Sequence, residues 1–534
     1  MKEFSAEKIP LSPDKLSEFK SIDLKYWTDP AYFKELLSFE PDLNNIPELI
    51  EIKKKTYNQR QNIIQILKNQ YSKIEDSIIT NQIIALQSEN CFTVVCAHQA
   101  VMLGGPLYWW YKICHTIGLC KSLSNKFPNY KFVPIYYAGT EDHDLDEINH
   151  LHIFNKKYIW DNSQSGATGR MSVENIASLL DEVKQAFQNS SEVLIELDEI
   201  KKFLNDAIDY ADFFRKFVHH LFGKHGLLFF NPDDKEAKSL FKNFMKNEVE
   251  NNFVEKYTSS SIQKLSELSF QAQAHVREIN LFYLSDQYRV GIYKDKENYC
   301  TKDEQYRWSK SSILKEIDEF PDRFSPNVLT RPLYQEFLFP NLIFIGGGAE
   351  VAYWMQLKSV FEHLNITYPI LFRRFSGLII NENLKERIRK TGVEWMDYLE
   401  DVQSINTKYL KLNSSLISGI KNSQEKIDAL LKHHAAFALN FSSSFQSSFE
   451  AELTKLEQQL DKLSAKLFKE EKSTHEVNLN KIQKIKDSLF PNKNLQERQE
   501  SGLTYYLEYG QSFIEFLINN YKDEDRLIVY LIKE

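Results

Sequence analysis

Short apolar runs without polar alternation are the feature that most constrains the fold. They lie between residues 91 and 377, each bounded by Gly, Pro or Asp, and read FTVVC, KFVPIYYAGT, HGLLFFNPDD, LIFIGGGAE and YPILFRR. A strand with one solvated face alternates polar and apolar residues, whereas a strand buried on both faces does not. Amphipathic helical segments follow several of these runs. The pattern therefore predicts an α/β fold with a doubly wound parallel sheet covered by helices.

The length of the chain calls for more than one domain. Its 534 residues exceed one compact core, because domains usually hold about 100–200 residues. Two stretches of the predicted core exceed an ordinary crossover, and insertions of this kind usually shape a binding site. We expect a helical cap over 1–90, a core over 91–380 with insertions at about 155–216 and 242–326, a hairpin over 381–490 and a segment over 491–534 that docks on the core.

The predicted hairpin rests on a leucine repeat in a segment with almost no glycine. Leucines step by three and four between Lys and Glu, as in a coiled-coil seam, at Leu453, Leu456, Leu460, Leu463 and Leu467. An earlier helix can supply the opposite side with Leu412, Leu416, Ile420, Ile427 and Leu430. An ordinary helical bundle is the alternative. A long hairpin leaves an apolar face, so we expect a homodimer.

Charge and cysteine content narrow the classes of function. A net charge of −8 does not favour a nucleic-acid or anionic-membrane partner. The five cysteines form no C-x-x-C pair and read as reduced thiols with no zinc site. The first residues lack a signal-peptide core, and no window holds about 18 uninterrupted apolar residues. We expect a cytoplasmic protein without a membrane span.

The stretch VVCAHQAVMLGGPLYWWYKI predicts the first strand, turn and helix of the core. Loops at the carboxyl end of parallel strands, followed by a helix start, present free N–H groups to anions. The small residues Gly104, Gly105 and Pro106 precede that helix, and a packing turn is the alternative explanation for them. His98 and Gln99 follow the buried strand directly, so they require partners or a ligand.

An acidic run follows the second strand, in YYAGTEDHDLDEINH. Its polar residues sit where open α/β sheets bind ligands, and they are Thr140, Glu141, Asp142, His143, Asp144 and Glu147. Three interpretations compete. The run could bind a divalent metal, directly or through ATP-bound Mg²⁺, or His143 could act as a general base oriented by a carboxylate. The Asp residues could instead cap the next helix.

A second glycine turn follows the strand in LIFIGGGAE. Gly346, Gly347 and Gly348 lead into a helix that carries Glu350 and Tyr353. The turn matches neither a Walker loop nor a G-x-G-x-x-G fingerprint. Nearby cations, Arg331 and Arg374, could bind phosphates through bidentate hydrogen bonds, or could form surface salt bridges.

Six ordered blocks together resemble the bacillithiol-biosynthesis cysteine-adding enzymes, a family of cysteine ligases. They are HQAVMLGGPLYWWYKI, GTEDHDLDEINH, GATGRM, HVREINLFYL, SPNVLTRPLYQEFLFPNLIFIGGGAEVAYWMQLK and LFPNKNLQERQ, and they span about residues 90–510. The resemblance implies a Rossmann-like core similar to class I aminoacyl-tRNA synthetases, with two connecting insertions and a dimeric coiled coil. It also implies that cysteine is joined through its carboxyl group to the amine of glucosaminyl-malate.

The resemblance also implies site residues. The first loop is matched by His98, Gln99, Gly105, Pro106, Tyr108 and Lys112, the acidic signature by Thr140 to Asp144 and Glu147, and the glycine turn by Gly346, Gly347, Glu350 and Tyr353. The family usually carries Thr-Gly before a Gln-Gln pair, where this chain has Cys96 and Ala97 before His98. It also usually carries Phe-Thr-Gly-Pro where this chain has Leu103 to Pro106. No HIGH or KMSKS sequence is present.

Amide formation at neutral pH requires an activated carboxyl group, so we expect ATP (or bound ADP), with Mg²⁺ as its metal partner. Cysteine would lie near His98, Gln99 and the acidic run. The catalytic residues would be Asp142, His143 and Asp144, with His143 or a neighbouring carboxylate deprotonating the sugar amine. Lys112, Arg331 and Arg374 would face phosphate or malate. A nucleotide-binding scaffold and a metal-dependent hydrolase are the alternatives.

Overall fold

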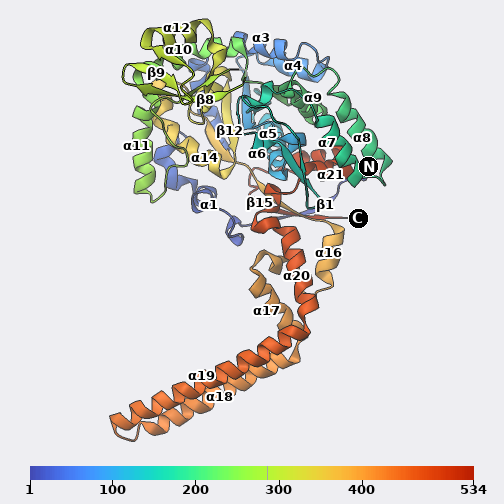
Figure 1. Cartoon of the computed structure of the whole chain (residues 1–534), viewed down its shortest axis with the longest axis vertical. Coiled ribbons are helices and arrows are strands. Elements are labelled where there is room, and N and C mark those ends of the chain that lie inside the picture. The colour runs from blue at the N-terminus through green and yellow to red at the C-terminus, as the bar shows by residue number, and fades with distance from the viewer. Residues whose placement is uncertain (286, 534) are drawn as a thin grey trace. The chain divides into compact units, whose positions relative to one another are not determined.

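The computed structural model describes residues 1–285 and 287–533 (Figure 1). These residues form two compact units. The first contains Met1–Leu378 and Glu497–Tyr530, and the second contains Ile379–Gln496 with the last residues from Leu531.

A five-stranded parallel sheet forms the centre of the first unit. Its strands are β2 (Cys91–His98), β3 (Lys131–Ala138), β6 (Leu228–Phe230), β12 (Asn341–Gly346) and β13 (Ile370–Arg373). They lie in the order β13-β12-β2-β3-β6, and every neighbouring pair is parallel. Nearly all strand residues are buried, as the unalternating apolar runs require. The predicted doubly wound α/β core is confirmed.

Helices cover the buried strands. The 20-residue helix α5 (Leu107–Lys126) packs on β2 and β3, and most of its residues are buried because apolar side chains surround it. Helices α2 (Ile46–Thr56) and α14 (Gly348–Trp354) pack on β12, and α9 (Tyr210–Phe222) packs on β6. These contacts leave the loops at the carboxyl ends of the strands as the place for a ligand.

The two chain ends meet in a small sheet. Within the predicted helical cap over 1–90, residues Ala6–Leu11 instead form strand β1, which pairs with β15 (Leu527–Ile532). Only a partner more than 500 residues away in sequence stabilises this strand, so local pattern does not reveal it. The other elements of the first 90 residues are helical, namely α1 (Ser21–Thr28), α2, α3 (Arg60–Gln70) and α4 (Ser77–Ala85).

Long excursions separate the core strands. Between β3 and β6 lie α6 (Leu145–Ile148), β4 (His150–Ile153), β5 (Lys156–Ile159), α7 (Ile176–Ala186), α8 (Ser191–Lys202) and α9. Between β6 and β12 lie helices α10 (Lys235–Asn251), α11 (Phe253–Glu267), α12 (Lys310–Glu319) and α13 (Arg331–Leu338). The same stretch contains an antiparallel sheet of β7 (Leu281–Leu284), β8 (Arg289–Asp295), β9 (Asn298–Thr301), β10 (Arg307–Ser309) and β11 (Phe324–Pro326). The remaining elements are α15 (Lys358–Leu364), β14 (Ser376–Ile380), α21 (Gly502–Tyr509) and α22 (Gln511–Asn519).

The second unit is helical. Its helices are α16 (Glu382–Arg389), α17 (Val402–Asn413), α18 (Ser415–Ala438), α19 (Ser443–Thr474) and α20 (Glu476–Leu489). Helices α18 and α19 pack against each other as the predicted antiparallel hairpin (Figure 1). Leu453 and Leu460 are half-buried, whereas Leu456, Leu463 and Leu467 are 47–57% exposed. The leucine repeat is therefore only partly covered by the partner helix.

Within residues 1–285 and 287–533, no helix combines the length and apolar character that crossing a bilayer would require.

Gly348 allows the first turn of α14 to approach an ion pair closely. A Cβ atom at this position would lie 2.1 Å from Cγ of Asp23, whose buried carboxylate accepts a 2.8 Å hydrogen bond from Arg373 Nε. We predict that Gly348→Ala lowers the free energy of unfolding by about 3 kcal/mol, because overpacking and a disturbed buried pair act together. Chemical denaturation measures this loss.

The neighbouring Gly347→Ala is a matched control. A Cβ atom there would meet its nearest neighbour, Glu350 Oε2, at 3.4 Å, and the backbone φ of −75° suits alanine. This variant should keep nearly the stability of the unmodified protein. Equal losses in the two variants would contradict the packing argument.

Candidate active site

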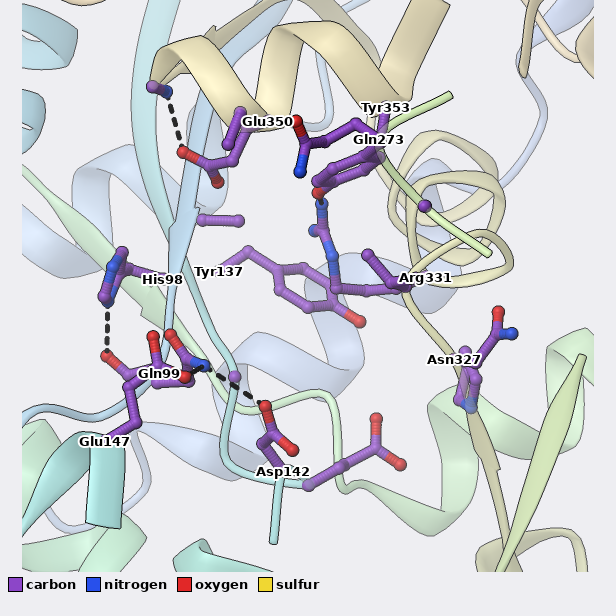
Figure 2. Close-up of a pocket in the computed structure, with 18 of the residues that line it drawn as sticks. His98, Gln99, Tyr137, Asp142, Glu147, Gln273, Asn327, Arg331, Glu350 and Tyr353 are labelled. Carbon is purple, nitrogen blue, oxygen red and sulfur yellow. Dashed lines mark hydrogen bonds between the residues drawn. The ribbon is translucent and has the colours of Figure 1, made fainter. Parts of the chain in front are cut away.

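A cavity of about 760 Å³ opens at the carboxyl ends of β2, β3 and β12 (Figure 2). From β2, the next two core strands in the chain, β3 and β6, lie on one side. The last two, β12 and β13, lie on the other side of β2. The chain thus reverses its strand order between β2 and β12, which is where open α/β sheets bind ligands. The lining includes His98 and Gln99 at the end of β2, Asp142 after β3 and Glu350 after β12.

His98 and Gln99, at the end of β2, present one acceptor and one donor to the cavity. His98 Nδ1 lies 3.3 Å from the carbonyl oxygen of Gln99, so the proton sits on Nδ1 and Nε2 keeps its lone pair. Burial and then the charge of Lys112 lower the pKa of His98 to about 3, so its ring is neutral. Gln99 Nε2 donates to Asp142 at 3.2 Å and to Glu147 at 2.6 Å (Figure 2). Gln99 thereby ties the first loop to the acidic run.

Asp142 is held as a carboxylate. Burial alone would raise its pKa, but hydrogen bonds from His143 and the charge of Arg289 outweigh that effect and hold the pKa well below its usual range. The contacts are a 2.8 Å bond from the His143 backbone N–H and a 3.2 Å bond from Arg289 Nη1. Asp144 is the N-cap of α6, because its side chain accepts a 3.1 Å hydrogen bond from the Glu147 N–H.

His143 and Glu147 are the two candidate bases at this edge. His143 is 48% exposed, and its Nδ1 lies 3.2 Å from Nη1 of Arg289. The same Nδ1 lies 3.4 Å from Asp142 Oδ1, so this nitrogen is occupied by the Arg289–Asp142 pair. Glu147 accepts one hydrogen bond, from Gln99. Burial, together with repulsion from Asp142 and Asp144, raises the pKa of Glu147.

Side chains of the protein supply the cations that the acidic run requires. Glu141 pairs at 2.9 Å with the fully buried Lys238, which also pairs with Asp233 at 2.7 Å. Arg170 donates two hydrogen bonds to the same Asp233. Thr140 is buried behind this network, outside the cavity lining, and donates to Asn231. In the part of the chain that the structure describes, no group of three or more His, Cys, Asp or Glu could hold a metal ion.

The glycine turn after β12 is closed by its own helix. The Gly347 N–H donates to Glu350 Oε2 at 2.7 Å, and the same carboxylate forms an ion pair with Lys112. Lys112 is 1% exposed and also donates to the Ala97 carbonyl at 2.8 Å, so it braces the two loops. Gly347, Gly348 and Tyr353 line the cavity, whereas Gly346 lies behind them.

Gly105 and Pro106 lie outside the cavity. The N–H of Leu107, the first residue of α5, donates to the Glu500 carbonyl at 2.8 Å, and the Gly502 N–H donates to the Gly105 carbonyl. Residues 500–502 thus cover the start of α5. Gly105 has φ of +45°, and a Cβ atom would approach Val101 to 2.9 Å, so glycine is required there for packing. The expected anion site at this helix start is closed.

The two predicted phosphate-binding arginines differ in their partners. Arg331 donates to the hydroxyl of Tyr353 at 2.8 Å and to Gln335 at 2.9 Å, and it packs over the ring of Tyr137. Arg374 is 3% exposed and forms a buried pair with Glu497 at 2.7 Å. Both line the cavity, so neither forms the surface salt bridge that was the alternative.

Several residues that line the cavity were not predicted from the sequence. They are Tyr137, Arg277, Phe282, Arg289, Asn327 and Arg498. Tyr137 follows the strand pattern and reads as core, and its hydroxyl has no hydrogen-bond partner among the described residues. Arg277 and Arg498 stand in the blocks HVREINLFYL and NLQERQ, where each arginine adjoins a glutamate. An arginine next to a glutamate in these two blocks was the sequence feature that could have indicated a functional role.

The charged groups of the cavity do not cancel. Glu141, Asp142 and Glu350 each face a cation, whereas Glu147 contacts none. Arg277, Arg331 and Arg498 form no ion pair with an acidic residue among the described residues. Within the described residues, the cavity therefore holds three arginines without an acidic partner and one carboxylate, Glu147, without a cation, and the pKa of Glu147 is raised. This excess of positive charge favours a ligand with several negative charges.

Comparisons with known proteins agree along the whole chain. A family model described as the BshC N-terminal Rossmann-like domain of bacillithiol biosynthesis matches residues 7–375, and the model of the BshC C-terminal coiled-coil domain matches residues 377–530. A protein named "Putative cysteine ligase BshC" from Christiangramia forsetii is 36% identical over 94% of both chains. Proteins of the same name from Flavobacterium psychrophilum and Bacillus licheniformis are 34% identical over 96% of both chains and 27% identical over 89% of this chain and 90% of the relative.

A solved structure titled as an arginyl-tRNA synthetase from Campylobacter jejuni covers 83% of this chain and 98% of its own at 12% identity. Its TM-score of 0.22 is too low to compare the two folds, so the likeness to class I synthetases stays a prediction. The two family matches, together with relatives above 30% identity over nearly full length, assign the chain without that comparison. The chain belongs to the BshC family of bacillithiol biosynthesis.

Proposed function

We propose that this protein is a cysteine ligase that joins the carboxyl group of cysteine to the amine of glucosaminyl-malate. The names of its relatives support a ligase acting on cysteine. ATP would supply the activation, as an acyl-adenylate or acyl-phosphate, because a free carboxylate does not condense with an amine. The products would be bacillithiol and either AMP with pyrophosphate or ADP with phosphate.

The observation that carries this proposal is the unbalanced positive charge of the cavity. A nucleotide and a malyl group each bring several negative charges, and arginines bind phosphate and carboxylate oxygens through paired N–H groups. Arg277, Arg331 and Arg498 meet that need. They would also stabilise charge that develops on phosphate during carboxyl activation. Mg²⁺ would arrive with the nucleotide, since it usually keeps water and phosphate oxygens and needs few protein ligands.

The two sides of the cavity suit different parts of the reaction. Acceptors lie at the ends of β2 and β3, namely His98 Nε2, Asp142 and Glu147, so the amines belong there. Glu147, with its raised pKa and single hydrogen bond, is the proton acceptor for the sugar amine. Asp142 and His143 hold Arg289 in place, and Gln99 orients Glu147.

The direct test incubates purified protein with ATP, cysteine and glucosaminyl-malate and measures the thiol product by mass spectrometry. We expect product that depends on all three substrates, with AMP or ADP released in equal amount. Nucleotide binding without product would favour the scaffold alternative. Hydrolysis that requires an added metal but no cysteine would favour the hydrolase alternative. Either result would overturn the proposal.

Variants in the same assay separate the two candidate bases. Glu147→Gln should lower kcat by about 100-fold or more, because a general base contributes roughly 10²–10⁴. Its removal should also abolish the acid limb of the pH profile, whose midpoint in the unmodified enzyme should lie above the ordinary glutamate value, since the pKa of Glu147 is raised. His143→Ala should keep that limb and lose less activity. The reverse order of losses would assign the proton transfer to His143.

We also propose that the hairpin forms a homodimer. Leu456, Leu463 and Leu467 lie on one face of α19 at spacings of seven and four, and each is about half exposed. Exposed leucines at coiled-coil spacing are stabilised by a second helical surface. A second copy of the hairpin offers such a surface with the same residues.

Sedimentation at micromolar concentration tests the dimer. The unmodified protein should sediment as a dimer, and the double variant Leu456→Glu with Leu463→Glu should sediment as a monomer. The matched control, Gln458→Glu with Ala465→Glu, adds the same charges on the opposite face of α19 and should remain dimeric. A monomeric unmodified protein, or a dimer that survives the leucine changes, would contradict the proposal.

A further inference from the structure

Arg498 stands at the cavity without a partner. It follows the second unit in sequence, at the end of the short turn Gln496–Arg498, and it lines the cavity together with Tyr108, Gly347 and Arg374. It is exposed, and it makes no hydrogen bond or ion pair with any residue that the structure describes. A guanidinium in that position is available to a ligand.

The preceding residue fixes where Arg498 lies. Glu497 is 1% exposed, and its carboxylate accepts four hydrogen bonds, two from Arg374, one from Ser376 and one from the Gly377 N–H. Because this buried carboxylate is fully satisfied, the backbone at position 497 has little freedom. The next side chain is thereby directed from a rigid anchor toward the cavity.

Three acidic residues near this wall are already paired with cations. Asp23 pairs with Arg373, Glu497 pairs with Arg374, and Glu350 pairs with Lys112. The excess charge at this wall is therefore positive, and it belongs to Arg498.

Arg374 adds a second donor without an acceptor. Its Nη1 and Nη2 are used by Glu497 and by the Phe375 carbonyl, but its buried Nε has no hydrogen-bond partner among the described residues. A Cβ atom built on Gly347 would lie 4.0 Å from this Nε, so the donor sits directly behind the glycine turn of the cavity wall. A buried donor without an acceptor in the protein is free to bind an acceptor atom of a ligand.

We propose that Arg498, with the unused Nε–H of Arg374, forms a subsite for an oxyanion. The chemistry that fits is a carboxylate or a phosphate, bound by the guanidinium of Arg498 and by the Nε–H of Arg374. The identity of the natural anion rests on the proposed function, in which the malyl group supplies carboxylates and the nucleotide supplies phosphates. The binding of an anion at this wall does not depend on turnover.

Calorimetry with two simple probes tests the subsite and distinguishes the sources. L-Malate represents the dicarboxylate and inorganic pyrophosphate represents the nucleotide, each titrated into the full chain at constant ionic strength. We expect Arg498→Gln to lower the affinity for at least one probe by about tenfold. The probe that loses affinity identifies whether the malyl group or the nucleotide supplies the anion. Arg498→Lys should recover only part of this loss, because it keeps the charge and lacks the fork.

Arg307→Gln is the matched control, since Arg307 is an exposed arginine outside the cavity lining and pairs with Asp295. It removes the same charge and should leave both affinities unchanged. The proposal is overturned if the unmodified protein binds neither probe, or if Arg498→Gln changes both affinities less than threefold. It is also overturned if the control loses as much affinity as Arg498→Gln.

The outcome is separable from that of the ligase assay. Weakened anion binding in Arg498→Gln, in a protein that makes no thiol product, would retain the subsite and reject the proposed reaction. Normal product formation by the unmodified protein, with unchanged anion binding in Arg498→Gln, would retain the proposed reaction and reject the subsite. If the reaction and the subsite are both correct, Arg498→Gln should raise the KM of the substrate whose probe binds more weakly to the variant. The KM of the other substrate should stay near its original value.

Discussion

The burial of a parallel sheet on both faces is the constraint on which the rest of the first unit depends. Once helices cover both faces of β2, β3 and β12, the carboxyl ends of these strands are the places where polar residues can meet a ligand. The reversal of strand order between β2 and β12 separates the loops there. His98, Asp142 and Glu350 are brought together by this topology, although about 250 residues separate the first from the last.

The charges of the cavity follow from how these loops are held. Three carboxylates of the cavity, Glu141, Asp142 and Glu350, are each paired with a lysine or arginine of the protein, which fixes the loops and the start of α14. Lys112 belongs to this structural set, so it is not available to a ligand in the described arrangement. The arginines that remain without acidic partners give the cavity its preference for anions.

The sequence predicted the parts that depend on local pattern. The five buried strands, the hairpin and the grouping of His98, Gln99, Asp142 and Glu350 at one edge all follow from apolar runs and from the residues after them. It could not predict contacts made by distant segments. Strand β1 needs β15, the start of α5 is closed by residues 500–502, and Arg498 reaches the cavity because Glu497 is anchored by Arg374. Such pairings leave no periodic signal in sequence.

The most direct test of this account is a crystal structure of the protein with glucosaminyl-malate and a non-hydrolysable ATP analogue. We expect both ligands in the cavity between His98 and Gly347, with carboxylate or phosphate oxygens within hydrogen-bond distance of Arg331 or Arg498 and the sugar amine facing Glu147. Ligands bound at saturation elsewhere on the chain, with this cavity holding only solvent, would contradict it.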